Sequence, residues 1–304
     1  MSVVMHNHTA SDRAAALNEA RLQYRREQRR IAWRSFVRHR LAFAGSIIVF
    51  AVLLLAVFAP VIARFDPLAV DVANRLKGPD AMHWFGTDNF GRDTFSRVAY
   101  GARISMFVGI SVALITGVLG LLIGLLASYF RRLDYALMRI CDGLMAFPAI
   151  LLAIAIVAAM GPKVGNVILA LSVVYTPNVA RAVRSVGLVV KEQTYVEALG
   201  SLGAGHARIL FRHIAPNCLT PVIVQGTFIF ADAIISEAAL SFLGAGIPAP
   251  AASWGNILYD GKMYIFNAWW MVVFPGALLM LTVFGLNMAG DGMRDLLDPH
   301  TKDK

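Results

Sequence analysis

Two acidic residues, Asp232 and Glu237, directly follow an uncharged stretch, 214–231. A carboxylate near the centre of a lipid bilayer costs about 2.5–3.5 kcal/mol by insertion measurements, so such groups usually face a polar pathway. We expect Asp232 to line a cavity. Glu237 either lines the same cavity or reaches the water on the outer side of the membrane. The two residues could be the acid pair of a membrane-embedded enzyme, or they could relay protons in a proton-coupled carrier. Their five-residue separation, however, places them on poorly matched helix faces.

Other patterns that support catalysis are missing. The nearest approach to a phosphate-binding loop, 261–263, lacks the hydroxyl residue after the lysine and the upstream glycine. His206 and His213 are seven positions apart with no acid between them, and Cys141 and Cys218 have no paired motif nearby. We therefore predict no enzyme activity, no metal and no cofactor, and any ATP hydrolysis would take place in a separate subunit.

The composition is that of a membrane protein. Hydrophobic residues make up 58% of the 304 residues, charged residues make up 15%, and the mean hydropathy is +0.62. Soluble domains have about 45–50% apolar and about 25% charged residues. The net charge of +9 would suit nucleic acid or anionic lipid. The distribution of the basic residues along the chain decides between these two.

Uncharged runs predict an all-α fold with six transmembrane helices. The first run, as a helix, is long enough to cross a hydrocarbon core of about 30 Å, and we interpret it as an uncleaved anchor. The fourth run gives the weakest signal because it is short and contains Pro177. The six runs are 41–63, 104–130, 143–162, 164–180, 214–231 and 263–290.

The basic residues give the orientation of the spans. Twenty Lys and Arg lie in alternate segments that include both ends of the chain, and eight lie in the segments between them. By the positive-inside rule, both termini are cytoplasmic. The positive-inside distribution thus explains most of the excess positive charge, so we expect no nucleic acid partner. The basic segment 1–40 would lie on anionic membrane lipid.

These predictions divide the chain into segments. A cytoplasmic segment, 1–40, precedes the first span, 41–63, and an outer loop segment, 64–103. Arg92, Arg97 and Arg103 in the outer loop are expected on a solvated interfacial helix. The transmembrane domain, 104–290, contains a cytoplasmic loop, 181–217, and a cytoplasmic tail, 291–304, follows it.

Small residues line one face of the second span. They recur at helical spacing, which allows another helix to approach closely, either as a specific motif or through ordinary enrichment of small residues in membrane helices. The residues are Ser105, Gly109, Ala113, Gly117, Gly120, Gly124 and Ser128.

The loop 181–217 contains a signal for a short helix. Thr194 followed by Glu197 fits a capping box, and Gly203 then Gly205 fit a left-handed stop. A helix of about two turns is unstable alone in water, so something must hold it. It is either a connector packed on its own domain or a knob inserted into the groove of a partner.

The sequence YVEALGSLGAGHARILFRHIAPN, 195–217, resembles the coupling motif of ATP-binding-cassette importer permeases. Glu197, Ala198, Gly203 and Pro216 match that motif, while Leu199 replaces its second alanine. Further stretches resemble the dipeptide, oligopeptide and nickel branch of this family. They are HRLAFAGSIIV with FDP, GTDNFGRDTFSRVAYGARIS, EAALSFLGAG with SWGNIL, AWWMVVFPG, and GDGMRDLLDP.

The resemblance implies a type I importer permease fold in a bacterial inner membrane. Two permease subunits, expected to be different chains, would enclose the pathway, and two cytoplasmic ATPase subunits would receive the short helix of each. A periplasmic binding protein would deliver peptides, although nickel, glutathione, opines or oligosaccharides remain open as cargo. Thr194, Glu197, Ala198, Leu199, Gly203 and Pro216 would be the ATPase-coupling residues.

Overall fold

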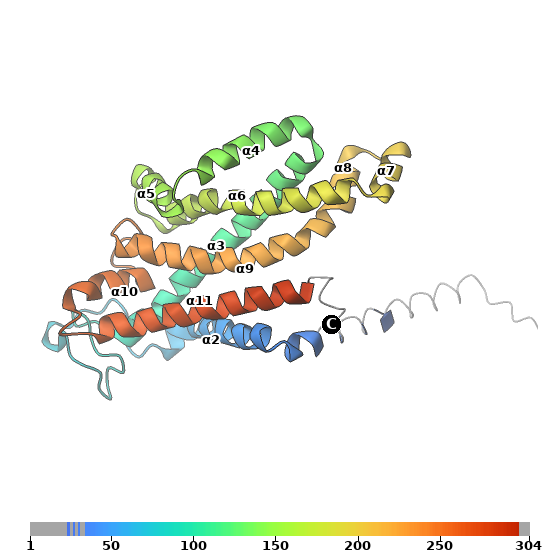
Figure 1. Ribbon diagram of the computed structural model, residues 1–304. Coiled ribbons are helices and arrows are strands. Elements are labelled where there is room, and N and C mark those ends of the chain that lie inside the picture. The colour runs from blue at the N-terminus through green and yellow to red at the C-terminus, as the bar shows by residue number, and fades with distance from the viewer. Residues whose placement is uncertain (1–22, 25–26, 28–29, 31–33, 298–304) are drawn as a thin grey trace, which may run out of the picture.

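The computed structural model describes residues 23–24, 27, 30 and 34–297. Throughout this part of the chain the regular structure is helical, apart from one isolated β-bridge between Thr87 and Asp93. The segments 1–40 and 291–304 lie partly outside the described residues, so the expected contact of the first segment with lipid stays a prediction. Figure 1 shows long helices that run beside one another and short helices at both ends of the bundle.

Five helices are long and apolar enough to cross a membrane. They are α2 (Arg40–Ile62), α3 (Thr94–Tyr129), α6 (Val164–Lys191), α9 (Ala215–Phe242) and α11 (Trp270–Leu297). A sixth candidate is the pair α4 (Arg131–Met145) and α5 (Ala149–Met160), which are bent by 94° from one another. The shorter elements are η1 (Val72–Asn74), α7 (Thr194–Ser201), α8 (His206–Ile209), the π-turn η2 (Leu210–Ile214), α10 (Trp254–Gly261) and η3 (Lys262–Tyr264).

The third predicted span, 143–162, is not one straight helix. Its first residues belong to the amphipathic helix α4, and the chain turns at Ala146 before α5 begins. Pro148 explains the position of the break, because the residue before a proline is disfavoured in the helical region. Alone, α5 has 12 residues and a length of about 18 Å, too short for a hydrocarbon core of about 30 Å.

The bounds of other spans also differ from those predicted. The fourth continues past residue 180 to Lys191, and the sixth runs from Trp270 to Leu297 instead of 263–290. The second span begins ten residues early, at Thr94, because the side chain of Asp93 accepts a hydrogen bond from the Ser96 N–H at 2.7 Å and caps the helix. The fifth continues to Phe242, so both acidic residues lie inside α9. Charged residues therefore did not mark the ends of the second and fifth spans.

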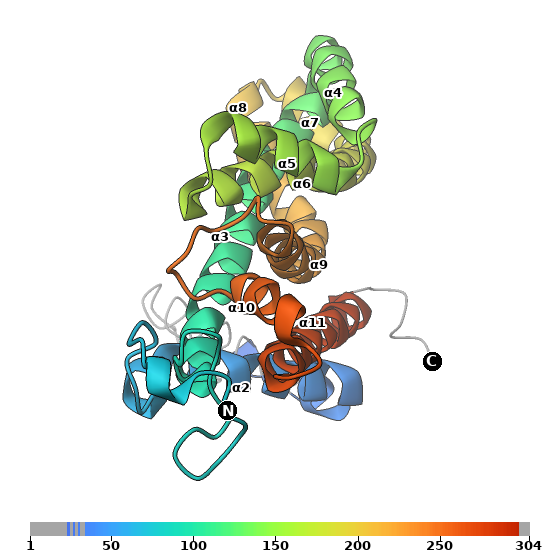
Figure 2. The same ribbon diagram turned by 90° about the vertical axis from the view of Figure 1, so that its left-hand side faces the viewer.

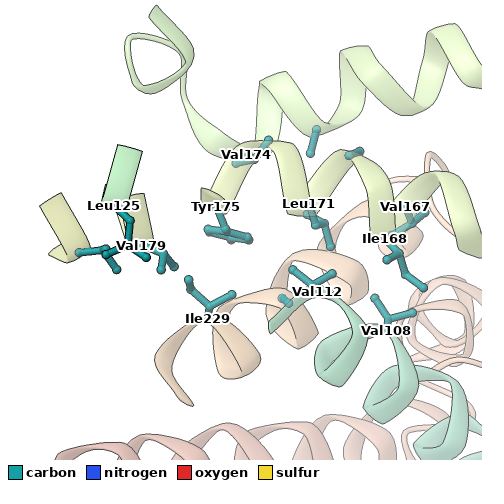
Figure 3. Close-up of a cluster of buried hydrophobic side chains, with 14 of the residues drawn as sticks. Val108, Val112, Leu125, Val167, Ile168, Leu171, Val174, Tyr175, Val179 and Ile229 are labelled. Atoms are coloured by element: carbon teal, nitrogen blue, oxygen red, sulfur yellow. The ribbon is translucent and has the colours of Figure 1, made fainter. Parts of the chain in front are cut away.

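The largest buried cluster joins α3, α6 and α9. Figure 3 shows Val112 of α3, Leu171 and Tyr175 of α6, and Ile229 of α9 within it. The small-residue face of α3 is what brings α6 this close, because a Cβ at Gly120 would lie 2.4 Å from the Val179 Cβ. The predicted close approach of another helix to this face is confirmed.

The two ends of the bundle carry different short elements. At one end, α7 and α8 lie at the same end as the start of α2 and the end of α11 (Figure 1). The Nε2 atom of His39, before α2, lies 3.2 Å from the Asp295 Oδ2 atom near the end of α11. At the other end, α10 packs against α3, α9 and α11, as Figure 2 shows from that side.

Candidate functional site

The short helix of the loop, α7, begins at Thr194 and ends at Ser201. The position agrees with the prediction, but the capping box does not form. Gln193 is the N-cap residue and no side-chain hydrogen bond caps the helix, so Thr194 is the first helical residue. Glu197 therefore lies in the first turn, where its negative charge still interacts favourably with the helix dipole.

Gly203 ends α7 as predicted. Its φ of +78° is in the left-handed region. The Gly203 N–H donates to the Gly200 carbonyl and the Ala204 N–H donates to the Leu199 carbonyl, both at 3.0 Å, which is the pattern of a Schellman motif. Gly205, by contrast, has a φ of −65° and is the N-cap of α8, so it takes no part in a left-handed stop.

The body of the protein holds α7 through one apolar side. Val196 is 5% exposed and belongs to the main buried cluster, on which Leu199 and Ala204 also pack. The flanking turns are tied to the end of α3: the Tyr129 hydroxyl lies 2.8 Å from His206 Nδ1, and Lys191 Nζ donates to the Tyr129 carbonyl at 2.8 Å. These contacts fix the position of α7 relative to the spans.

The opposite side of α7 is open. Thr194, Glu197, Ala198 and Gly203 are exposed, and Leu202 is 83% exposed. Within the described part of the chain, Glu197 makes no ion pair. Leu202, small residues and an unpaired carboxylate therefore share a side of α7 that the other described segments leave uncovered.

The helix after α7 connects this surface to the fifth span. Helix α8, the π-turn and α9 follow one another without a break, and they form one apolar segment from His206 to Phe242. Pro216 is in the first turn of α9, where it is exposed and has no N–H to donate to the widened turn before it. A displacement of α8 would therefore reach α9 directly.

The two acidic residues of α9 occupy different environments. Glu237 is completely buried, and its carboxylate accepts hydrogen bonds from the hydroxyls of Ser105 and Ser241, each at 2.9 Å. Asp232 lies on the exposed side of the helix. The two carboxylates therefore do not share a site, and the structure gives no support to an enzymatic acid pair. Glu237 joins α9 to α3 instead of facing an open cavity.

The segment 64–103 contributes to an ion cluster that the sequence pattern did not reveal. Arg92 and Arg97 are 6% and 2% exposed, so the prediction of a solvated helix is wrong for them. Asp88 Oδ2 lies 2.6 Å from Arg92 Nε and 3.4 Å from Arg97 Nε, and Asp260 of α10 lies 3.2 Å and 3.3 Å from the two guanidinium groups. Asp88 and Arg92 form an i, i+4 pair, but Asp260 comes from a distant segment that no local spacing indicates.

Comparisons with known proteins identify the family. Residues 116–303 match the model of the binding-protein-dependent transport system inner membrane component, and residues 27–79 match the N-terminal transmembrane domain of oligopeptide transport permease C.

Curated relatives cover most of this chain. A putative peptide transport system permease protein of Brucella abortus is 49% identical over 88% of this chain and 91% of its own length. The dipeptide transport system permease protein DppC of Alkalihalophilus pseudofirmus is 45% identical over 90% of both chains. The di/tripeptide transport system permease protein DppC of Pseudomonas aeruginosa is 37% identical over 98% of both.

These matches cover both the first span and the segment that contains α7. The chain therefore belongs to the binding-protein-dependent transport system inner membrane components, the permeases of ATP-binding-cassette importers, and is a multi-pass protein of the inner membrane.

Proposed function

We propose that this chain is a permease subunit of an importer for peptides, and that with a second permease subunit it encloses the pathway across the membrane. The cargo follows from the relatives, whose names specify peptides, dipeptides, or di- and tripeptides. Asp232, exposed on α9, is a candidate for the pathway wall. A binding protein would deliver the peptide at the end of the bundle that carries α10.

The observation that carries the proposal is the geometry of α7. One side is anchored by Val196 and the other exposes Leu202 and Glu197. A cytoplasmic ATPase subunit would bind the exposed side, and its closure on ATP would displace α7 as a rigid element. Because α8 and α9 continue from it, this displacement would tilt the fifth span and switch the pathway between two states.

Directional transport then requires that the two states bind the peptide with different affinity, since a ligand with equal affinity for both shifts nothing. The coupling residues would be Thr194, Glu197, Ala198, Leu199, Gly203 and Pro216, all in or beside the segment that the ATPase moves. The α7 end of the bundle would be cytoplasmic, together with both termini.

The test is peptide uptake by proteoliposomes that contain the complete importer with its ATPase and binding protein. Gly200 is exposed on α7, and a Cβ there would meet no other atom within 4 Å. Gly200→Leu therefore adds bulk to the partner surface without an internal clash. We expect this variant to keep ATP hydrolysis but to lose most peptide uptake.

Gly165→Leu is the matched control, because Gly165 is also exposed and a Cβ there would also meet no other atom within 4 Å, but it lies in the first turn of α6 at the other end. It should leave uptake close to the wild-type level. Equal uptake by both variants would contradict coupling through α7. Uptake that persists without ATP and follows a proton gradient would favour the carrier instead, and uptake of nickel, glutathione, opines or oligosaccharides without peptides would overturn the proposed cargo.

A further inference from the structure

Charged side chains surround a pocket of about 460 Å³ between α4 and α6. On α4, the lining residues recur at spacings of three and four, which places them on one face of the helix. On α6, the two lining arginines are three positions apart and share a face in the same way. The lining consists of Asp134, Tyr135, Met138, Arg139, Asp142, Arg181 and Arg184.

The pocket lies at the inner end of the fourth span. Arg181 follows Val164, the first residue of α6, by seventeen positions, a rise of about 25 Å along the helix. It directly follows the uncharged run 164–180, at the border that we predict between this span and the cytoplasm. Figure 1 shows α4 beside α6 at one edge of the molecule. The pocket would face the pathway if the second permease subunit of the proposed importer packs against this edge.

Two ion pairs connect the helices, and they differ in strength. Arg184 binds Asp134 through two parallel bonds, Nε to Oδ1 at 2.5 Å and Nη2 to Oδ2 at 2.7 Å, with side chains 34% and 22% exposed. Arg181 binds Asp142 through one contact, Nη2 to Oδ1 at 2.6 Å, with side chains 46% and 50% exposed. The second pair is the weaker one, because exposed single contacts contribute little to stability.

A third cation in the pocket has no acidic partner. The Cζ of Arg139 lies 5.3 Å from the centre of the Tyr135 ring, and no ion pair of Arg139 is present within the described residues. Three guanidinium groups and two carboxylates leave the pocket with an excess of one positive charge. An anion can therefore enter without leaving an acid unpaired.

We propose that this pocket is a cargo station that binds the free C-terminal carboxylate of a peptide, a proposal that rests on the peptide-importer function above. The carboxylate replaces Asp142 on Arg181, and Asp142 can then pair with Arg139, three positions before it on the same face of α4. The guanidinium of Arg181 can bind a carboxylate through two parallel N–H groups, which gives both strength and orientation. Arg184 and Asp134 stay paired and hold α4 against α6 during the exchange.

The test compares a tripeptide that has a free C-terminal carboxylate with its C-terminal amide. Uptake is measured in proteoliposomes with the complete importer, at peptide concentrations that saturate the binding protein with either form. The quantity compared between variants is the ratio of acid uptake to amide uptake, because the binding protein is the same in all of them. Arg181→Gln should lower this ratio about tenfold or more, since a hydrogen bond between charged groups is lost.

Three further variants separate cargo binding from a structural role. Arg181→Lys keeps a cation and should preserve part of the preference for the acid. Asp142→Asn removes the competing carboxylate and should raise the preference. Arg132→Gln is the matched control, because Arg132 is an exposed arginine of α4 that does not line the pocket, and it should leave the ratio unchanged.

The outcomes distinguish this proposal from the proposed function. If the wild-type importer takes up neither peptide, the peptide-importer function is wrong and the station falls with it. If it takes up both, and Arg181→Gln lowers both in the same proportion, the function stands and the station is overturned. The station is also overturned if Arg181→Gln lowers the uptake of both peptides equally and the size of this loss depends on the anionic lipid content of the vesicles. The pocket would then bind a lipid headgroup.

Discussion

The hydroxyl of Ser105 on α3 donates a hydrogen bond to Glu237 on α9 at 2.9 Å, although the two residues are 132 positions apart. Both side chains are completely buried. The Ser241 hydroxyl donates to the other carboxylate oxygen at 2.9 Å, so both oxygens of the acid are bonded. A buried carboxylate is tolerated only when it is bonded in this way, and this one fixes α3 and α9 relative to one another.

Glu237→Ala should destabilise the protein, because it leaves the hydroxyls of Ser105 and Ser241 without their acceptor. We expect the free energy of unfolding to fall by about 1–3 kcal/mol for each unsatisfied group. Glu237→Gln retains one acceptor oxygen and should cost less. Thermal unfolding of the detergent-solubilised chain measures both, and equal losses for the two variants would disprove the bridging role.

Asp88→Asn should be more damaging, because Arg92 and Arg97 would lose their most buried counter-charge. Removal of one partner from a buried ion pair costs about 3–5 kcal/mol. Asp80→Asn is the control, since Asp80 is an exposed carboxylate of the same loop that accepts hydrogen bonds from the backbone N–H groups of Met82 and His83. Melting temperatures provide the comparison, and a loss at Asp88 no larger than at Asp80 would contradict the cluster.

Asp260 gives a pH dependence with a definite sign. Burial raises the pKa of its carboxyl above the ordinary value of 3.8, although Arg97 and Arg92 act in the opposite direction. Since the folded-state pKa is the higher one, the stability that the group contributes is present below the unfolded pKa and is lost as the pH rises through the folded pKa. The melting temperature of the wild type should therefore fall relative to Asp260→Asn as the pH rises. If the melting temperature of the wild type instead rose relative to Asp260→Asn as the pH rises, the pKa of Asp260 would be lowered by folding, which would contradict the prediction.

Uncharged runs and Gly203 were sufficient to predict most of the fold and the position of α7. They failed where one residue interrupts an uncharged run and where the determinant is a contact between distant segments. Pro148 breaks the third span inside an apolar run. Asp232 and Glu237 both lie within α9, because Asp232 is exposed and the carboxylate of Glu237 is hydrogen-bonded to Ser105 of another helix. The buried position of Arg97 depends on Asp260, which is 163 positions away, and no spacing along the chain indicates such a contact.

The orientation of the bundle is a separate prediction. The excess of basic residues in the inner segments places the α7 end and the C terminus in the cytoplasm. A fluorescent reporter fused after residue 304 should fold and fluoresce, whereas a periplasmic phosphatase fused there should stay inactive. The same phosphatase inserted after Ala81, in the exposed outer loop, should be active. The reverse pattern at both positions would invert the proposed topology.

The proposed function requires the ATPase subunit to bind the exposed side of α7. A photo-crosslinking residue at position 202 tests this most directly, because Leu202 is 83% exposed at the end of α7, and Met263, 78% exposed at the opposite end of the bundle, is the matched position. In membranes that contain the complete importer, the probe at 202 should crosslink to the ATPase subunit and the probe at 263 should not. Crosslinking of the ATPase from 263, or its absence from 202, would contradict the account.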